Sequence, residues 1–483
     1  MTAAPCIMVL GTTSGAGKSW IATALCRWYA RQGLKVAPFK AQNMSNNARV
    51  VEGGEIGSAQ YFQALAAGAE PEVRMNPVLL KPERDTHSQV VLLGRVNDAL
   101  TRMPWRDRGE AVWPHVRRSL DALREENDLV VIEGAGSPAE INLKSSDIVN
   151  MRVAVHAGAR CLLATDIDRG GAFAHLFGTW SLLEPQERAL LHGFVLNRFR
   201  GDASLLAPGP EQLEALTGVP TVATLPMWWG HGLPEEDGVF DDRATGSGTG
   251  KVESTIAVIA YPRISNLDEF QQLRNIPGVR LVWARTPAAV KGADWIVLPG
   301  SKHTASDLAW LRAQGLDIAV SEHAARGGRV LGICGGLQML GEALVDTHGI
   351  DGNAPGLGLL PLVTVFAPEK IVRRTQARFG PLHGAWSMLD GVAARGYEIH
   401  QGRTMQHPGM APGHVAMAGD LAWQNAAGNV LGVYLHGLFE DAAVVQALFG
   451  ASAPTLERVF DGLADFVDCH FAPEFLARLA QGR

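Results

Sequence analysis

Residues 6–19 read CIMVLGTTSGAGKS and join a short apolar run to a glycine-rich turn and a Lys-Ser pair. The apolar run has the length of a buried strand, and the residues after Ser19 have the pattern of a helix. Glycines let the backbone curl so that its N–H groups face an anion, and the N-terminus of the helix adds a favourable dipole. The stretch therefore predicts a phosphate-binding loop, in which Lys18 supplies a point charge and Ser19 supplies a hydroxyl for Mg²⁺.

The spacing of this loop departs from the simple G-x-x-x-x-G-K-S pattern, because Thr12 stands where the first glycine belongs. We expect Gly15, Gly17, Lys18 and Ser19 to bind the phosphates of ATP. The longer form is similar to the loop of dethiobiotin synthetase and its relatives. A glycine-rich turn that binds no ligand is the plain alternative.

Further apolar runs that end in glycine or polar residues lie at 129–133, 161–165 and 193–197. Longer stretches with a helical pattern separate them. Strands that alternate with helices are typical of a parallel sheet that is covered on both faces. We therefore predict an α/β domain over residues 1–240.

The clearest change in composition is DDRATGSGTGKVES at 241–254, which is poor in apolar residues and rich in Gly, Ser and Thr. We predict that this segment is a linker. The α/β alternation then resumes, which predicts a second α/β domain over 255–483. Its expected strands lie at 254–260, 295–300, 328–336 and 430–437.

The bulk properties favour an enzyme with small-molecule partners. The 483 residues exceed one ordinary core, and the net charge of −6 without a basic run gives no reason to expect nucleic acid or an anionic membrane as a partner. The N-terminus lacks the pattern of an export signal, and no uninterrupted apolar segment reaches about 18 residues. The five cysteines are scattered, as in proteins of a reducing compartment. We expect a cytoplasmic protein.

Two acidic residues are candidates for the metal site beside Ser19. Mg²⁺ on a triphosphate usually takes one or two carboxylates besides the hydroxyl. Glu133 ends the run 129–133, where the carboxyl ends of strands border a ligand crevice. Glu55, in GGEIG, is the second candidate. Either could instead be a surface acid in a loop.

Other polar residues follow the predicted strands. Asn197 could contact adenine through its amide or simply cap a loop. Lys40 could contact a substrate carboxylate or the γ-phosphate, or be an exposed lysine at a strand end. Asp166 and Asp168 follow the run 161–165 and could assist substrate or metal.

The segment RVLGICGGLQ at 329–338 runs from an apolar strand through a tight turn into a helical stretch. This is the pattern of a nucleophile elbow, in which a sharp turn exposes Cys334 and a helix N-terminus favours its thiolate. His436, at the end of another predicted strand, could act as the base. The backbone N–H groups of Gly300 and Gly335 could form an oxyanion hole. A buried inert cysteine and a core histidine are the plain alternatives.

The elbow followed by a distant histidine resembles the class I glutamine amidotransferases. In that family the Gln four residues after the Cys helps to hold glutamine, and Gln338 matches it. The family usually places Glu two residues after the His, whereas this chain has Leu438 there. The group that orients His436 stays open between Glu440, a backbone carbonyl and no partner. The resemblance implies a flavodoxin-like glutaminase domain.

Four further stretches carry a more specific resemblance. They are PFKAQNMSNN (38–47), GGEIGSAQ (53–60), YPRISNLD (261–268) and LPGSKHTASDL (298–308). With them, almost the full length of the chain resembles the cobyric acid synthase family, whose amidases also lack that Glu.

The resemblance implies an α/β protein of two domains, a P-loop parallel-sheet synthetase and a class I glutaminase. It implies amidation of the b, d, e and g carboxylates of adenosylcobyrinic acid a,c-diamide in cobalamin biosynthesis, with glutamine, ATP and Mg²⁺. Lys302 and His303 belong to the family pattern without a role that we assign.

Elementary chemistry agrees with this class, because a carboxylate is a poor electrophile and phosphoryl transfer makes it reactive toward ammonia. The chemistry therefore requires two sites, one that activates the acid and one that releases ammonia. We expect ammonia from Cys334 to reach the activated acid near Lys18 and Glu133 without mixing with bulk water. The alternatives are cobyrinic acid a,c-diamide synthase, which shares both halves but not PFKAQNMSNN, a non-catalytic nucleotide switch or scaffold, and a ligase of cell-wall precursors.

Overall fold

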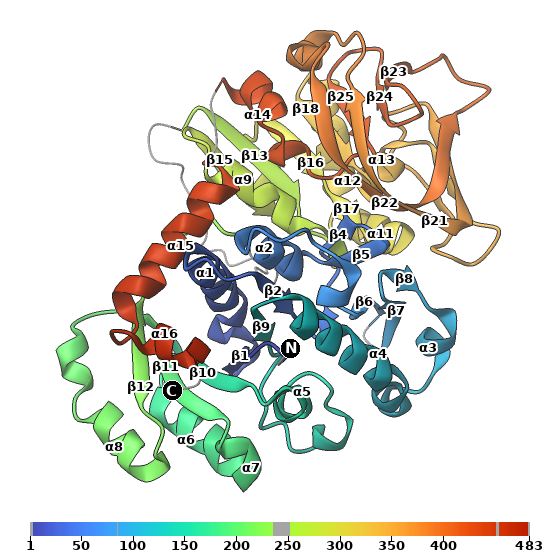
Figure 1. The fold of residues 1–483 in the computed structure, drawn as a ribbon. Coiled ribbons are helices and arrows are strands. Elements are labelled where there is room, and N and C mark those ends of the chain that lie inside the picture. Colours follow the sequence, from blue (N-terminus) through green and yellow to red (C-terminus); the bar gives the residue numbers. More distant parts are fainter. Residues whose placement is uncertain (1–2, 85, 235–251, 451–453, 482–483) are drawn as a thin grey trace.

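The computed structural model describes residues 3–84, 86–234, 252–450 and 454–481, and two separate sheets form its cores (Figure 1). The predicted linker at 241–254 lies outside the described residues as far as position 251. Across those described ranges, no helix is long and apolar enough to cross a membrane.

The first sheet has six parallel strands in the order β12-β11-β10-β1-β9-β2. Its central strands are apolar and buried along their whole length, as expected when helices cover both faces. The predicted α/β class is therefore confirmed for this half. The strands are β1 (Cys6–Gly11), β2 (Val36–Phe39), β9 (Leu129–Glu133), β10 (Arg160–Asp166), β11 (Leu191–Phe199) and β12 (Thr221–Pro226).

The second sheet has seven strands in the order β15-β13-β16-β18-β25-β24-β23, with an antiparallel edge formed by the last two. The two-domain α/β architecture is thus confirmed. Its parallel strands are β13 (Ser254–Ile259), β15 (Val279–Ala284), β16 (Trp295–Leu298), β18 (Arg329–Ile333) and β25 (Val430–Val433), and its edge strands are β24 (Ala422–Gln424) and β23 (His414–Met417).

Four smaller sheets accompany the two main ones in the described residues. The hairpin β4-β5 belongs to the first half of the chain but contacts the long hairpin β21-β22 of the second half (Figure 1). The strands of the four smaller sheets are β3 (Gln42–Met44), β4 (Ala48–Val51), β5 (Gly54–Gly57), β6 (Val78–Arg84), β7 (His87–Leu92), β8 (Arg95–Val96), β14 (Ile264–Ser265), β17 (Gly300–Ser301), β19 (Ala343–Val345), β20 (Ala354–Pro355), β21 (Leu362–Arg378) and β22 (Ala393–Gln406).

Helices cover the sheets, and α1 follows the predicted phosphate loop directly. Those of the first half are α1 (Lys18–Arg31), α2 (Ser58–Ala66), α3 (Asp98–Arg102), α4 (Trp105–Glu126), α5 (Met151–Ala157), α6 (Ala172–Leu182), α7 (Pro185–Arg188) and α8 (Gly209–Thr217). Those of the second half are α9 (Gln271–Arg274), α10 (Pro287–Val290), α11 (Thr304–Ala313), α12 (Leu316–Ala325), α13 (Gly335–Leu340) and α14 (Ala442–Phe449).

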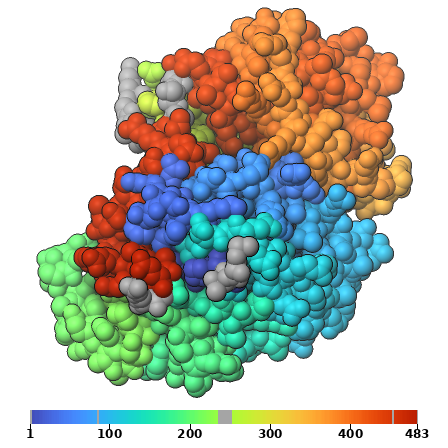
Figure 2. Space-filling model, in the orientation of Figure 1, coloured from blue at the N-terminus to red at the C-terminus, as the bar shows by residue number. Residues whose placement is uncertain are grey.

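The last two helices, α15 (Leu456–His470) and α16 (Phe475–Gln481), pack on the first domain. Figures 1 and 2 show this red segment against the blue α1. Phe460 is buried in the core of the first sheet, and the Tyr29 hydroxyl donates to the Leu476 carbonyl at 2.8 Å. Residues 454–481 therefore pack on the first domain, although we predict from the sequence that they belong to the second domain, 255–483. An amphipathic helix pattern shows that α15 has an apolar face, but not which sheet that face covers.

Candidate active sites

The phosphate loop has the predicted geometry between β1 and α1. Gly17 has a φ of 93°, which is strained for other residues, and a Cβ there would overlap the Asn197 amide. A Cβ at Gly15 would lie 3.0 Å from the Arg169 guanidinium. The Lys18 ammonium donates to the carbonyl oxygens of Thr13 at 2.9 Å and of Gly136, after β9, at 3.1 Å. The lysine thus joins the loop to the end of β9.

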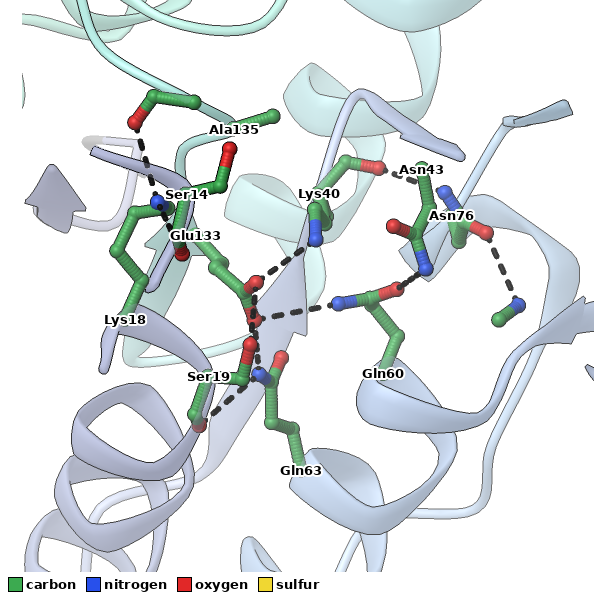
Figure 3. A network of polar contacts seen from close by, with 12 residues as sticks. Ser14, Lys18, Ser19, Lys40, Asn43, Gln60, Gln63, Asn76, Glu133 and Ala135 are labelled. Atoms are coloured by element: carbon green, nitrogen blue, oxygen red, sulfur yellow. Dashed lines mark hydrogen bonds and ion pairs between the residues drawn. The ribbon is translucent and has the colours of Figure 1, made fainter. Parts of the chain in front are cut away.

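Glu133 is the centre of a polar network beside this loop (Figure 3). Its Oε1 accepts from the Ser19 hydroxyl at 2.9 Å and from the Lys40 ammonium at 2.7 Å. Its Oε2 accepts from the Gln63 amide at 2.5 Å and, more weakly, from Gln60 at 3.4 Å. Burial alone would raise the pKa of Glu133, but Lys40 and the hydrogen bonds lower it below its usual value. The hydroxyl, carboxylate and ammonium expected from the sequence therefore meet in one place.

This donor set fits a Mg-nucleotide. Mg²⁺ prefers hard oxygen ligands and usually takes one or two protein groups besides phosphate and water. The Ser19 hydroxyl and the anionic Glu133 carboxylate are such groups, and they are already in contact. The loop beside them presents a glycine-rich turn at a helix N-terminus, where phosphate binds.

Asn197 and Asp166 lie on the other side of β1 from Glu133. The Asn197 amide donates to the Ala16 carbonyl at 2.9 Å, so it lies against the phosphate loop. Asp166 ends β10, and its carboxylate pairs with Arg198 at 3.0 Å and Arg169 at 3.2 Å. The structure thus places Asp166 apart from Lys40, which was expected to share its substrate role.

The structure does not bring Glu55 to Ser19 and Glu133. The β4-β5 hairpin directs Glu55 toward the second domain, where its two carboxylate oxygens pair with Lys81 and with Lys370 of β21. Burial would raise the pKa of Glu55, but the two ammonium groups lower it to about 2. Glu55 is therefore part of a buried ion cluster between the domains.

The predicted nucleophile elbow is present at the end of β18. Cys334 has φ 53° and ψ −107°, a strained conformation for a residue other than glycine, and α13 begins at the next residue. A Cβ at Gly336 would overlap the Leu298 carbonyl, so the tight turn depends on glycine there. Such a turn holds the thiol at the carboxyl edge of the sheet.

His436 is oriented by Glu269, a residue that the sequence analysis missed. The His436 Nδ1 lies 3.1 Å from Glu269 Oε1, and the Gly437 N–H donates to Glu269 Oε2 at 2.9 Å. Both side chains are buried. Burial lowers the pKa of His436, but Glu269 and Cys334 raise it to about 10. The imidazolium form is therefore favoured, and Cys334 contributes to this both by charge and by a side-chain hydrogen bond with His436.

The other candidates of the glutaminase site meet beside Cys334. A Cβ at Gly300 would lie 2.8 Å from His436 Cε1, and a Cβ at Gly335 would lie 2.7 Å from the Ser301 nitrogen. The two turns expected to supply oxyanion N–H groups are therefore in contact.

Gln338 lies on α13 one turn after the elbow. Its amide donates to the Gln401 carbonyl at 3.0 Å and accepts from the Thr304 hydroxyl at 3.2 Å. It lines a cavity together with Cys334. Gln338 and the predicted nucleophile therefore border the same cavity.

Residues of the first domain also line the cavity at Cys334, namely Asn46, Lys81 and Glu83. Lys302, which had no assigned role, crosses the domain boundary and pairs with Glu83 at 2.9 Å. The first domain thus closes the glutaminase cavity on one side. His303, the residue after Lys302, lies 3.2 Å from Asp351 of the same domain.

A phosphate loop with a Ser-Glu-Lys cluster on one parallel sheet, and a Cys-His-Glu arrangement on another, define a glutamine-hydrolysing carbon-nitrogen ligase. The CobQ/CobB/MinD/ParA nucleotide binding domain matches residues 7–228, and the CobB/CobQ-like glutamine amidotransferase domain matches 255–444. The cobyric acid synthase of Variovorax paradoxus (strain S110) is 76% identical over 467 residues, covering 96% of this chain and 97% of that protein. That of Paracidovorax citrulli (strain AAC00-1) is 72% identical over 492 residues, covering 99% and 100%. This chain belongs to the cobyric acid synthase family.

The Glu269–His436 contact generates a prediction. Glu269→Gln removes the charge that raises the pKa of His436, so the basic limb of the pH profile of glutamine hydrolysis should move to lower pH. The rate should fall by roughly 100-fold, within the range for a lost acid–base arrangement. Steady-state glutaminase assays across pH measure both effects.

The matched control is Glu322→Gln, because Glu322 is an exposed residue of α12 that pairs only with Arg326 at 3.6 Å among the ion pairs of the described chain. It should leave rate and profile unchanged. An unshifted profile in Glu269→Gln would show that Glu269 does not set the charge of His436.

Proposed function

We propose that this protein amidates the b, d, e and g carboxylates of adenosylcobyrinic acid a,c-diamide in the cytoplasm, with ATP as activator and glutamine as nitrogen donor. The observation that carries the proposal is the pairing of two complete sites in a chain similar to cobyric acid synthases over nearly its whole length. Residues 1–240 would form the synthetase domain, completed by α15 and α16, and the glutaminase domain would begin at 255.

In the synthetase site, ATP supplies the phosphoryl group that turns a carboxylate into an acyl phosphate open to attack by ammonia. Lys18 and the loop N–H groups would hold the phosphates. Ser19 and Glu133 would hold Mg²⁺, as their contact at 2.9 Å supports. Lys40, which pairs with Glu133 at 2.7 Å, would bind the substrate carboxylate or the γ-phosphate.

In the glutaminase site, the Cys334 thiolate would attack the amide carbon of glutamine. The Gly335 N–H and the turn at Gly300 would stabilise the oxyanion. His436 would donate a proton to the departing ammonia, and water would then hydrolyse the thioester to glutamate. Glu269 keeps His436 in the protonated form that this donation requires.

Separate variants test the two sites. Cys334→Ala should abolish amidation with glutamine but leave amidation with free ammonia, because only the first requires the thiol. Mass spectrometry of the corrinoid product, after incubation with ATP, Mg²⁺ and either nitrogen source, counts the amides added. The matched control is Cys469→Ala, at an exposed cysteine.

The complementary variant is Lys18→Ala, which should stop amidation with both nitrogen sources while some glutaminase activity remains. The account fails if Cys334→Ala also loses amidation with ammonia while its fold is intact, since the sites would then not be separate. Addition of only two amides to cobyrinic acid, and none to the a,c-diamide, would favour the a,c-diamide synthase.

The corrinoid would bind in a pocket next to the phosphate loop. This pocket includes Gly136, whose carbonyl accepts from Lys18 at 3.1 Å, so it reaches the reacting phosphates. Met44 and Trp105 also line it and are 57% and 46% exposed. They offer a flat apolar macrocycle a contact surface within reach of the activating site.

Trp105→Ala should raise the KM for the a,c-diamide about tenfold, equivalent to about 1.4 kcal/mol, because the substrate loses an aromatic contact. The KM for glutamine should not change. Initial-rate assays with each substrate varied in turn separate the two constants. Trp229→Ala is the control, since Trp229 is 64% exposed and lies outside the pocket. An unchanged corrinoid KM in Trp105→Ala would place the substrate elsewhere.

A further inference from the structure

We propose that Arg49 of the first domain is a positioning residue for glutamine hydrolysis in the second domain. It would act through the segment Leu267–Phe270, which carries Glu269, the carboxylate that holds His436. The inference rests on the glutaminase chemistry proposed above.

The Arg49 side chain reaches from the first domain to two carboxylates of the second domain. It lies on β4 and is only 1% exposed. Its Nη2 pairs with Asp268 and lies 2.7 Å from Glu440 Oε1, while its Nη1 lies 3.1 Å from Glu440 Oε2. A planar guanidinium suits this two-oxygen contact, which a lysine cannot reproduce. One cation of the first domain therefore pairs with two carboxylates of the second.

These two carboxylates depend on Arg49. Burial raises the pKa of Asp268 and of Glu440, and in both cases Arg49 opposes this effect. Asp268 directly precedes Glu269 in the chain. Without Arg49, Asp268 loses its partner and can move. Such a movement would also displace the next residue, Glu269, which orients His436.

The backbone around Arg49 also holds the segment that carries Glu269. The Ala48 N–H donates to the Asn266 side-chain oxygen, and the Leu267 N–H donates to the Asn47 side-chain oxygen, both at 3.0 Å. Asn266 has a φ of 53°, in the left-handed region that asparagine adopts more readily than most residues other than glycine. The first domain thus fixes this segment at its start, by hydrogen bonds, and at Asp268, by charge.

An aromatic ring joins Arg49 to His436 on another side. The Arg49 guanidinium lies 5.1 Å from the centre of the Tyr397 ring, and that ring stacks on His436 with centroids 5.4 Å apart. Tyr397 and His436 also exchange backbone hydrogen bonds of 2.9 and 3.2 Å. Removing the guanidinium therefore loosens the packing behind the imidazole as well.

The segment around Arg49 leads to the synthetase site. After β5 the chain enters α2, whose Gln60 and Gln63 donate to Glu133. Residues 47–63 therefore contact groups of both active sites. This continuity explains why a residue so far along the chain from Cys334 is suited to position the glutaminase groups.

Arg49→Met should lower the kcat of glutamine hydrolysis on the order of 100-fold, the scale of a misplaced reacting group, with the KM for glutamine nearly unchanged. Arg49→Lys should recover part of the loss, because it restores the charge without the two-oxygen geometry. Ammonia-dependent amidation should stay normal in both variants, which shows that they fold. The control is Arg326→Met, at an exposed arginine.

A double-mutant cycle identifies the route. If Arg49 acts through Glu269, the double variant Arg49→Met with Glu269→Gln should be about as slow as Glu269→Gln alone. Multiplied losses would overturn the inference, as would a normal kcat in Arg49→Met or an equal fall of the ammonia- and glutamine-dependent rates in both Arg49 variants. A full rate in Glu269→Gln would instead overturn the glutaminase mechanism itself.

Discussion

A carboxylate removed from water destabilises a protein by several kcal/mol unless a cation or hydrogen-bond donors replace the solvent. Both active sites and the boundary between them are built around this constraint. Four buried carboxylates each face a cation that another segment supplies: Glu133 faces Lys40, Glu269 faces His436, Asp268 faces Arg49, and Glu55 faces Lys81 and Lys370. The pairs of Glu133 and Glu269 each lie within one domain. The pairs of Asp268 with Arg49 and of Glu55 with Lys370 join the two domains.

The docking also has an apolar part. The chain leaves the second domain after α14 and returns to the first, where α15 lies along α1 (Figure 2). Together with the hairpin β4-β5, which contacts β21 and β22, this return connects the domains at two places. Such an arrangement suits an enzyme whose two reactions depend on one another, because it keeps the cavity at Cys334 closed by residues of the first domain.

The sequence predicts those features that depend on local pattern. The phosphate loop and the cysteine elbow are each a strand, a glycine turn and a helix in succession, so short-range rules are sufficient for Lys18, Ser19 and Cys334. Glu133 and His436 were found because strand ends share one edge of a parallel sheet. Glu269 was not, since it lies 167 residues from His436 and follows a stretch, 261–268, that has no chemical signature of its own. Arg49 and the packing of α15 depend on long-range contacts in the same way, and Glu55 was misplaced because a hairpin turned it toward the second domain.

We propose that nitrogen freed at Cys334 reaches the acid activated beside Glu133 inside the docked protein. The most direct measurement supplies glutamine labelled with ¹⁵N in its amide together with an excess of unlabelled ammonia, and determines the isotope content of the product amides by mass spectrometry. The account predicts that the product keeps most of the label. A product with the isotope ratio of the free ammonia pool would contradict it, because the two sites would then exchange nitrogen through the solvent.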